Sequence, residues 1–184
     1  MNDRVLVPGF EFMPAWWGPR LHVWGYVDRA CTAPSLLVVH CGSSRADVAG
    51  YLADPVDAEG PGAVLCHDGH WRRMVATHAA WSGDVATGHL VQMVGLERES
   101  WGTGTARWRG VVAQRIAIHV ELPGPPTLDR AGNQLEELQR WTRGCLEAGA
   151  PLTHWVRHSA IDNTRRDPGP GLAADWAEGL LEAG

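Results

Sequence analysis

The chain has 184 residues, of which 45% are hydrophobic and 20% charged, and its formal net charge is -5. This length and composition are ordinary for a single soluble globular domain. The negative charge argues against a binding face for duplex nucleic acid or a polybasic membrane patch, and no apolar run approaches the roughly 18 residues of a membrane span. We therefore expect no nucleic-acid partner and no stable membrane insertion.

The cysteine pattern and the first residues favour a cytoplasmic origin. Four cysteines lie at positions 31, 41, 66 and 145, without the paired spacing of a disulfide framework. The first twenty residues lack the basic-then-apolar layout of a signal peptide. We expect a monomer that is made in the cytoplasm. All sixteen basic residues are arginine, so any role usually filled by lysine must fall to another residue.

The first third of the chain predicts a buried strand followed by a helix. Residues 35–40, "SLLVVH", form an apolar run that suits a central strand ending at His40. Ser43 or Ser44 can then cap a helix that ends before Pro55. Further on, Asp-Gly between "GAVLCH" and "HWRRMVA" predicts a β-hairpin. The histidines in or after this hairpin are expected on the surface; they are His67, His70, His78 and His89.

The second half of the chain predicts two more strands and two helices. Residues 115–122, "RIAIHVEL", alternate so that His119 and Glu121 share one face of a strand. Residues 127–148 carry apolar side chains at helical spacing, and residues 152–158 read as another strand. The final stretch, "LAADWAEGLLEA", predicts a terminal helix. Together the elements predict an α/β or α+β fold, with a mixed central β-sheet flanked by helices.

Two histidines and one carboxylate have the residue types of a zinc site. His40 and His158 each end a predicted strand, where ligand sites of such sheets tend to lie. Asp167 follows His158 after a short loop and precedes "PGPG". Catalytic zinc takes three protein ligands and leaves a fourth position for water. Spacing alone leaves open the other interpretation, in which both histidines are satisfied core or rim residues.

Three stretches in order resemble a known family. They are "VVHCGSS", "HDGHWRRMVATHAAWSG" and "RHSAIDNTRRDPGP". This order is similar to the type 2 N-acetylmuramoyl-L-alanine amidases, which include phage amidase-type lysozymes, bacterial cytosolic recycling amidases and peptidoglycan recognition proteins. The resemblance is most specific in the last stretch. It implies the fold of these proteins, with a zinc amidase domain over residues 33–184 and an N-terminal extension, residues 1–32, packed on it.

The resemblance also implies a ligand set and a substrate. The zinc ligands would be His40, His158 and Asp167, and the substrate would be peptidoglycan or a muropeptide. Arg165 stands where the family has a lysine, two positions before the last ligand. Arginine supplies the same charge and a forked set of donors, so we expect it to stabilise the oxyanion of the reaction.

Two residues are candidates for the general base. The family has a glutamate in its central strand, and our alignment places His119 at that position. Glu121 lies two residues on, with its side chain on the same face, and is the second candidate. A family tyrosine before the hairpin is absent, because Pro61 and Gly62 occupy its place.

The resulting functional prediction is zinc-dependent hydrolysis of the bond between N-acetylmuramic acid and L-alanine. We expect a phage endolysin that acts on the cell wall after release. A cytosolic muropeptide-recycling amidase is the second interpretation. The absent tyrosine motivates a third, a peptidoglycan-binding protein of the same fold without catalysis. A structural zinc site would require a fourth ligand, such as Cys41 or His154.

Overall fold

The computed structural model describes residues 5–13, 33–43, 46–53, 63–65, 71–73, 77–100, 102–125, 132–169 and 171–184. The turn at Asp68, the histidines His67 and His70, and the expected tyrosine position at Pro61 lie outside these residues.

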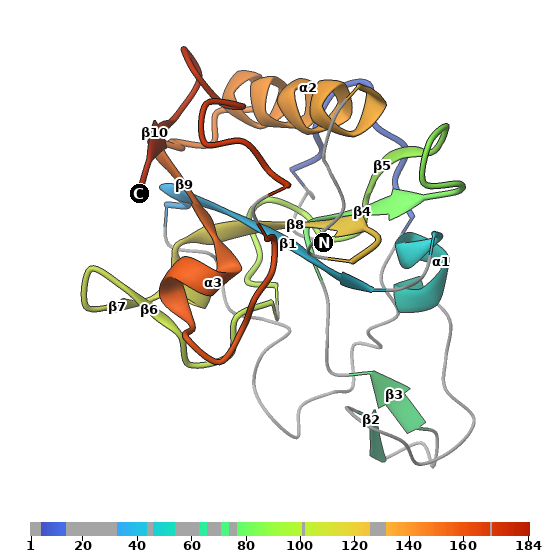
Figure 1. Cartoon of the computed structure of the whole chain (residues 1–184), viewed down its shortest axis with the longest axis horizontal. Helices are drawn as coiled ribbons and strands as arrows, with labels where there is room; N and C mark the ends of the chain where they lie inside the picture. The colour runs from blue at the N-terminus through green and yellow to red at the C-terminus, as the bar shows by residue number, and fades with distance from the viewer. Residues whose placement is uncertain are drawn as a thin grey trace.

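A six-stranded sheet with the order β10-β9-β1-β8-β4-β5 forms the centre of the molecule (Figure 1). Its strands are β1 (Leu36–Ser43), β4 (Ala79–Ser82), β5 (His89–Gln92), β8 (Ala117–Pro123), β9 (His154–Arg157) and β10 (Glu182–Ala183). Neighbouring strands are parallel except for β4 and β5, which are antiparallel. The expected mixed sheet flanked by helices is therefore confirmed.

The two faces of β1 have different surroundings because successive side chains of a strand point to opposite sides. Leu37, Val39 and Cys41 belong to the main hydrophobic core. Leu138, Trp141 and Cys145 of α2 (Asn133–Glu147) are buried in the same core, so α2 covers this face. Leu36 and Val38 belong to a smaller apolar cluster on the other face, where His40 also points. The short helix α3 (His158–Ile161) lies on that second side of the sheet (Figure 1).

The smaller elements agree with the sequence in type and differ in detail. Strands β2 (Ala63–Leu65) and β3 (Trp71–Arg73) pair antiparallel, as the hairpin prediction required. Helix α1 (Val48–Ala53) begins later than expected. Asp47 caps it, because its Oδ1 accepts the Gly50 amide hydrogen at 3.0 Å. A further short pair, β6 (Arg107–Trp108) and β7 (Val111–Val112), precedes a 3-10 turn, η1 (Ala113–Arg115), which leads into β8.

The N-terminal segment, residues 5–13, lies along β5. The Gln92 amide donates to Glu11 O and the Met13 amide donates to Gln92 O, both at 2.8 Å. Val7 is buried in the main core. This stretch therefore packs on the sheet. Residues 14–32 lie outside the described part of the chain, so the division into an extension over residues 1–32 and a domain over residues 33–184 stays a prediction.

The last residues do not form the expected helix. Residues 171–180 run through turns, and β10 then joins the sheet beside β9. Leu172, Trp176 and Ala177 are buried against the main core. The apolar residues that suggested a helix are therefore the ones that contact the core from successive turns.

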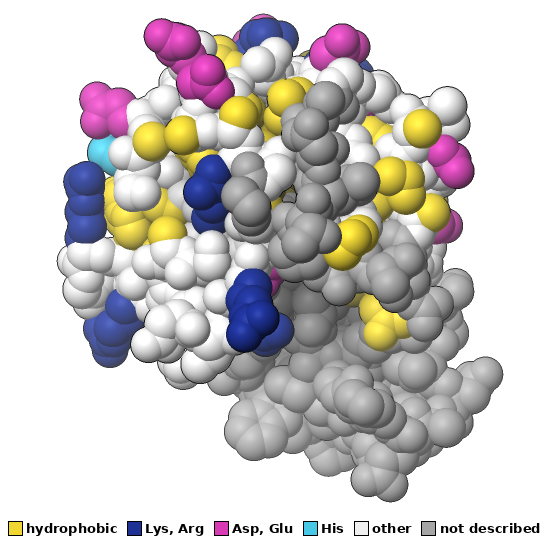
Figure 2. Space-filling view, in the orientation of Figure 1, with side chains coloured by type: hydrophobic (Ala, Val, Ile, Leu, Met, Phe, Trp, Pro, Cys, Tyr) yellow, Lys and Arg dark blue, Asp and Glu magenta, His cyan; other side chains and the backbone are white. Residues whose placement is uncertain are grey.

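No helix among the described residues is long and apolar enough to cross a membrane. On the face shown in Figure 2, arginine side chains of the described residues lie apart from one another, and do not merge into one basic patch.

Candidate metal centre

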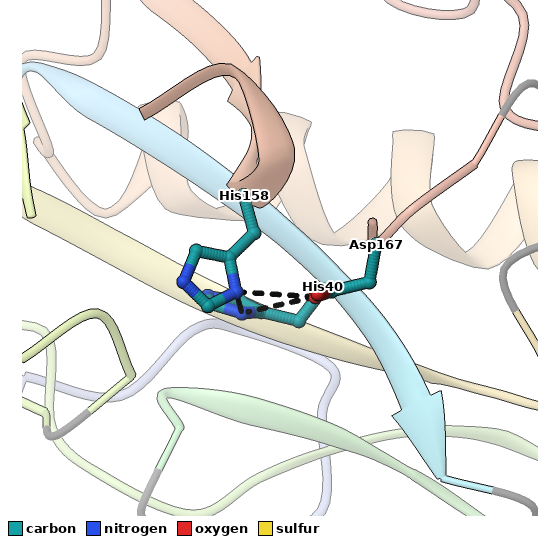
Figure 3. A group of neighbouring side chains, drawn as sticks. All are labelled: His40, His158 and Asp167. Atoms are coloured by element: carbon teal, nitrogen blue, oxygen red, sulfur yellow. Dashed lines mark hydrogen bonds and ion pairs between the residues drawn. The ribbon is translucent and has the colours of Figure 1, made fainter. Parts of the chain in front are cut away.

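Three segments bring His40, His158 and Asp167 together (Figure 3). The β1–β9 register pairs Val39 with Arg157, so the next residue of each segment, His40 and His158, lies at the same level of the sheet. His158 is the first residue of α3, and not the last residue of a strand as the sequence suggested. The loop after α3 folds back, because the Ser159 amide donates to Asp167 O at 2.8 Å.

The ligand atoms of these three residues converge on one point. Nδ1 of His40 lies 3.0 Å from Nδ1 of His158. Oδ2 of Asp167 lies 3.1 Å from Nδ1 of His158 and 3.7 Å from Nδ1 of His40. Both histidines are buried and the Asp167 side chain is 14% exposed. One edge of the group therefore remains open to solvent.

The charge states of the group suit metal binding. Burial lowers the pKa of His40 to about 4, against the opposing effect of its hydrogen bond with Asp167. For Asp167, burial alone would raise the pKa, but hydrogen bonds with His158 and His40 outweigh it and hold the pKa below its usual range. At neutral pH His40 is therefore neutral and Asp167 ionised, which are the forms that bind a metal.

Zinc fits this donor set. Ligands held about 2.0–2.2 Å from a tetrahedral zinc lie about 3.4 Å from one another. The observed separations of 3.0, 3.1 and 3.7 Å bracket this value. Two imidazole nitrogens and one carboxylate leave a fourth position, as in catalytic zinc sites. Among the described residues, no other group of three or more metal-binding side chains converges in this way.

The two residues considered as a fourth ligand lie elsewhere. Cys41 is buried in the main core, on the opposite face of β1 from His40. Nδ1 of His154 lies 2.8 Å from Thr153 Oγ1, and its Nε2 lies 3.2 Å from a carboxylate oxygen of Glu182. The alternative of a closed structural zinc site therefore finds no support in the described residues.

His119 lies behind His40 and does not face the ligand atoms directly. Its Nδ1 is 3.0 Å from Nε2 of His40, the ring nitrogen turned away from Asp167. The ring is fully buried. Burial, followed by the charges that His40, His78 and His158 would carry, holds the pKa of His119 well below the ordinary value. His119 is thus in contact with the candidate ligand rather than with the open edge of the site.

His78 is the residue that the sequence placed wrongly. It was expected on the surface, yet it is fully buried beside His119. Its Nε2 donates to Arg98 O at 2.8 Å, and its Nδ1 accepts the His119 amide hydrogen at 3.0 Å. Burial lowers the pKa of His78 to about 4, only partly offset by the bond to Arg98. His89, by contrast, is exposed as expected.

Glu121 and Arg165 lie at the margin of the group. Glu121 pairs with His40 across β1 and β8, and its half-buried side chain shares the face of His119. Arg165 follows α3 with its side chain 60% exposed, and its Nε is 3.9 Å from Asp162 Oδ2. Its charge is near enough to contribute to the lowered pKa of His40. Both side chains are therefore at least partly exposed to solvent near the group.

A hollow of about 430 Å³ lies against α3, and the three converging residues themselves do not line it. Thr105, Ala106 and residues 159–163 line it, so its wall begins at the residue after His158. Hydroxyl, amide and carboxylate groups in this wall make it a polar hollow.

Comparison with solved structures identifies the fold. The chain is similar to a selenomethionine derivative of AmpD, with a TM-score of 0.64 and 22% sequence identity over 98% of this chain and 99% of that one. The fold is AmpD-like. The chain is also similar to AmpDh3 from Pseudomonas aeruginosa, with a TM-score of 0.60 and 18% identity over 85% of this chain and 63% of that one. No family model and no curated protein matches the sequence. The fold implied by the family resemblance is confirmed.

Proposed function

We propose that this protein is a zinc-dependent amidase that hydrolyses the bond between N-acetylmuramic acid and L-alanine in peptidoglycan. The observation that carries the proposal is the convergence of His40, His158 and Asp167 within an AmpD-like fold. The sequence resemblance to the type 2 amidases supports the choice of bond.

The three side chains would hold the metal and leave one position open. When bound, zinc supplies Lewis acidity that makes a water nucleophilic near neutral pH and polarises the carbonyl. The water oxygen joins the lactoyl carbonyl carbon, the C–N bond breaks, and the alanine nitrogen takes a proton and leaves as an amine. Buried His40 and His158 exclude solvent from one side, and the open edge at Asp167 admits substrate.

Glu121 is the better placed of the two candidates for the general base. Nδ1 of His119 is engaged with His40, and its Nε2 is buried. Neither nitrogen is therefore free to meet the attacking water. Glu121 follows His119 by two residues toward the carboxyl end of β8. It pairs with His40 across the two strands, and its side chain is partly exposed. We propose that Glu121 accepts the proton of the water and passes it to the leaving amine.

Arg165 is proposed to stabilise the oxyanion. Its guanidinium keeps its charge at any physiological pH and cannot serve as a proton donor there. It can place N–H donors against the carbonyl oxygen as negative charge develops. Exposure of 60% leaves the side chain free to move onto a bound substrate.

The polar hollow beside α3 is the proposed place for the muropeptide. Its wall adjoins His158, and its hydroxyl and amide groups suit sugar and peptide hydrogen bonds. An endolysin must cut intact walls after its release from the cytoplasm, whereas a recycling enzyme acts on soluble fragments. We propose the first of these roles, and assays on both kinds of substrate separate them.

Product analysis tests the proposal. The zinc-loaded protein is incubated with purified cell walls and, in parallel, with soluble muropeptides. We expect new amino groups without new reducing sugar ends, and loss of both activities in His158→Ala. Release of amino groups from muropeptides but not from cell walls would assign the recycling role. Wall binding without release of amino groups from either substrate would contradict the proposal and favour the non-catalytic interpretation.

A further inference from the structure

The ring of His40 uses its two nitrogens for different contacts. Nδ1 belongs to the converging ligand atoms, and Nε2 lies 3.0 Å from Nδ1 of His119. A neutral imidazole has one N–H donor and one lone-pair acceptor. If Nδ1 of His40 is to offer its lone pair to a metal, the proton must be on Nε2, and the partner of Nε2 must accept it.

His119 is held where it can accept that proton. The rings of His78 and His119 stack with centroids 5.9 Å apart and planes 14° apart. On another side, a Cβ added to Gly102 would come within 2.6 Å of Nδ1 of His119. The glycine backbone therefore lies close to the ring beside Nδ1. Stacking and close packing together restrict the rotation of His119.

The protonation of His78 is decided by its two partners. A carbonyl oxygen can only accept, so Nε2 of His78 carries the hydrogen that Arg98 O receives at 2.8 Å. A backbone amide can only donate, so Nδ1 of His78 has the lone pair that receives the His119 amide hydrogen at 3.0 Å. The His78 amide also donates to His119 O at 2.9 Å. His78 thus holds the backbone of His119 at two points, the His119 amide through its ring Nδ1 and the His119 carbonyl through its own amide.

Packing alone does not explain a histidine at position 119. Its Nε2 is buried and has no hydrogen-bond partner among the described residues. Such an unpartnered group is costly, and a leucine of similar size would avoid the cost. The polar contact with His40 is therefore the feature of this side chain that needs a histidine.

We propose that His119 and His78 are positioning residues for the metal centre: His119 accepts the Nε2 proton of His40, which turns the Nδ1 lone pair toward the metal, and His78 holds His119 in place. The inference rests on the proposed zinc site. Partners of this kind fix the ring and the tautomer of a metal-binding histidine, and their loss typically weakens metal binding about 10–100-fold.

Zinc affinity measured against a chromophoric chelator at neutral pH tests this role. His119→Leu keeps the bulk and removes the acceptor, so we expect zinc binding to weaken about 10–100-fold. His119→Asn places an acceptor oxygen close to the position of Nδ1 and should restore most of the affinity. His154→Leu, on β9 and bonded elsewhere, is the matched control and should bind zinc as the unmodified protein does.

Two further readouts separate positioning from folding. Circular dichroism of each zinc-free variant checks that the fold is kept. Nitrogen-15 NMR of the histidine rings should find the proton of His78 on Nε2 in the unmodified protein.

Equal zinc affinity in His119→Leu and the unmodified protein would overturn the inference and leave the amidase proposal standing. Equal weakening by leucine and asparagine would overturn it in favour of packing. The predicted loss and rescue, without any peptidoglycan cleavage by the unmodified protein, would support the inference and contradict the amidase proposal.

Discussion

At the scale of single residues, four histidines with the same side chain differ in role because their surroundings differ. His40 and His158 present Nδ1 to Asp167. His119 and His78 are equally buried, yet Nδ1 of His119 contacts His40, and both ring nitrogens of His78 contact backbone groups. Burial lowers the pKa of His40, His78 and His119 and keeps these three rings neutral, and hydrogen-bond partners then decide which nitrogen carries the proton. The chemistry of the site thus depends as much on hydrogen-bond direction as on residue type.

Replacement of Arg165 tests the proposed oxyanion contact. Arg165→Ala should lower kcat about 10²–10³-fold, because loss of one oxyanion donor has typically this effect. Zinc content should not change, since Arg165 is not among the converging ligands. Arg166→Ala, also exposed, is the matched control and should keep full activity. An unchanged kcat in Arg165→Ala would remove this residue from the mechanism.

The buried histidines predict how stability responds to acid in the zinc-free protein. Unfolded His40 and His78 take up protons near pH 6.5, whereas folded they do so only near pH 4. Between these values the unfolded state binds more protons, so the free energy of unfolding falls as the pH falls. The loss is at most about 3 kcal/mol for each histidine.

Asp167 adds to this loss at lower pH. Its pKa is depressed in the folded state, so its stabilisation is present above about pH 4 and disappears as the pH falls further. Urea unfolding with a chelator present, at a series of pH values, measures both effects. His89→Asn, at an exposed histidine, should give the same curve as the unmodified protein. Stability that stays constant from neutral pH to pH 4.5 would show that the histidines are not buried as described.

At the scale of elements, the site depends on the segments that begin where the parallel strands end. β1 and β9 are parallel neighbours, so their carboxyl ends lie together, and α3 starts directly after β9. The loop after α3 then returns Asp167 to the same place. The apolar run of β1 and the alternation of β8 could be predicted from sequence because both patterns are local. The contact between β8 and His78 could not, because a stretch such as "THAAW" carries no local sign of which side is buried.

Two more elements differ from their prediction, the terminal stretch and the start of α1. The terminal stretch has helical spacing, but Gly179, with φ of 77°, turns the chain and β10 pairs with β9. The start of α1 was missed for a local reason, because Asp47 and not a predicted serine accepts the amide hydrogen of Gly50. The ligand set could be named from the sequence resemblance, whereas the shell behind it depends on contacts between residues 41 or more positions apart.

The N-terminal segment offers a test at this scale. Gln92 of β5 is fully buried; its Oε1 accepts the Val7 amide hydrogen at 2.8 Å, and its Nε2 donates to Val5 O at 3.1 Å. Gln92→Leu would leave the Val7 amide buried without a partner, so we expect a loss of about 1–3 kcal/mol in the free energy of unfolding. Urea denaturation measures it, with the exposed α2 change Arg143→Leu as control. A loss no larger than that of the control would mean that residues 5–13 are not docked through Gln92.

At the scale of the whole molecule, the candidate metal centre joins segments that are distant in sequence. His40 belongs to the first strand of the sheet, whereas His158 and Asp167 lie near the end of the chain. A metal bound only by the folded protein stabilises the fold by about 2.7 kcal/mol at a hundred times its Kd. Bound zinc would therefore link the strand that carries His40 to the loop that carries Asp167, and it would stabilise both together.

We propose that His40, His158 and Asp167 together hold one zinc ion. Native mass spectrometry of the purified protein after zinc loading and removal of free metal tests it most directly. We expect one zinc per chain in the unmodified protein and in His154→Leu, and none in Asp167→Ala or His158→Ala. Zinc retained in either ligand variant, or no zinc in the unmodified protein, would contradict it.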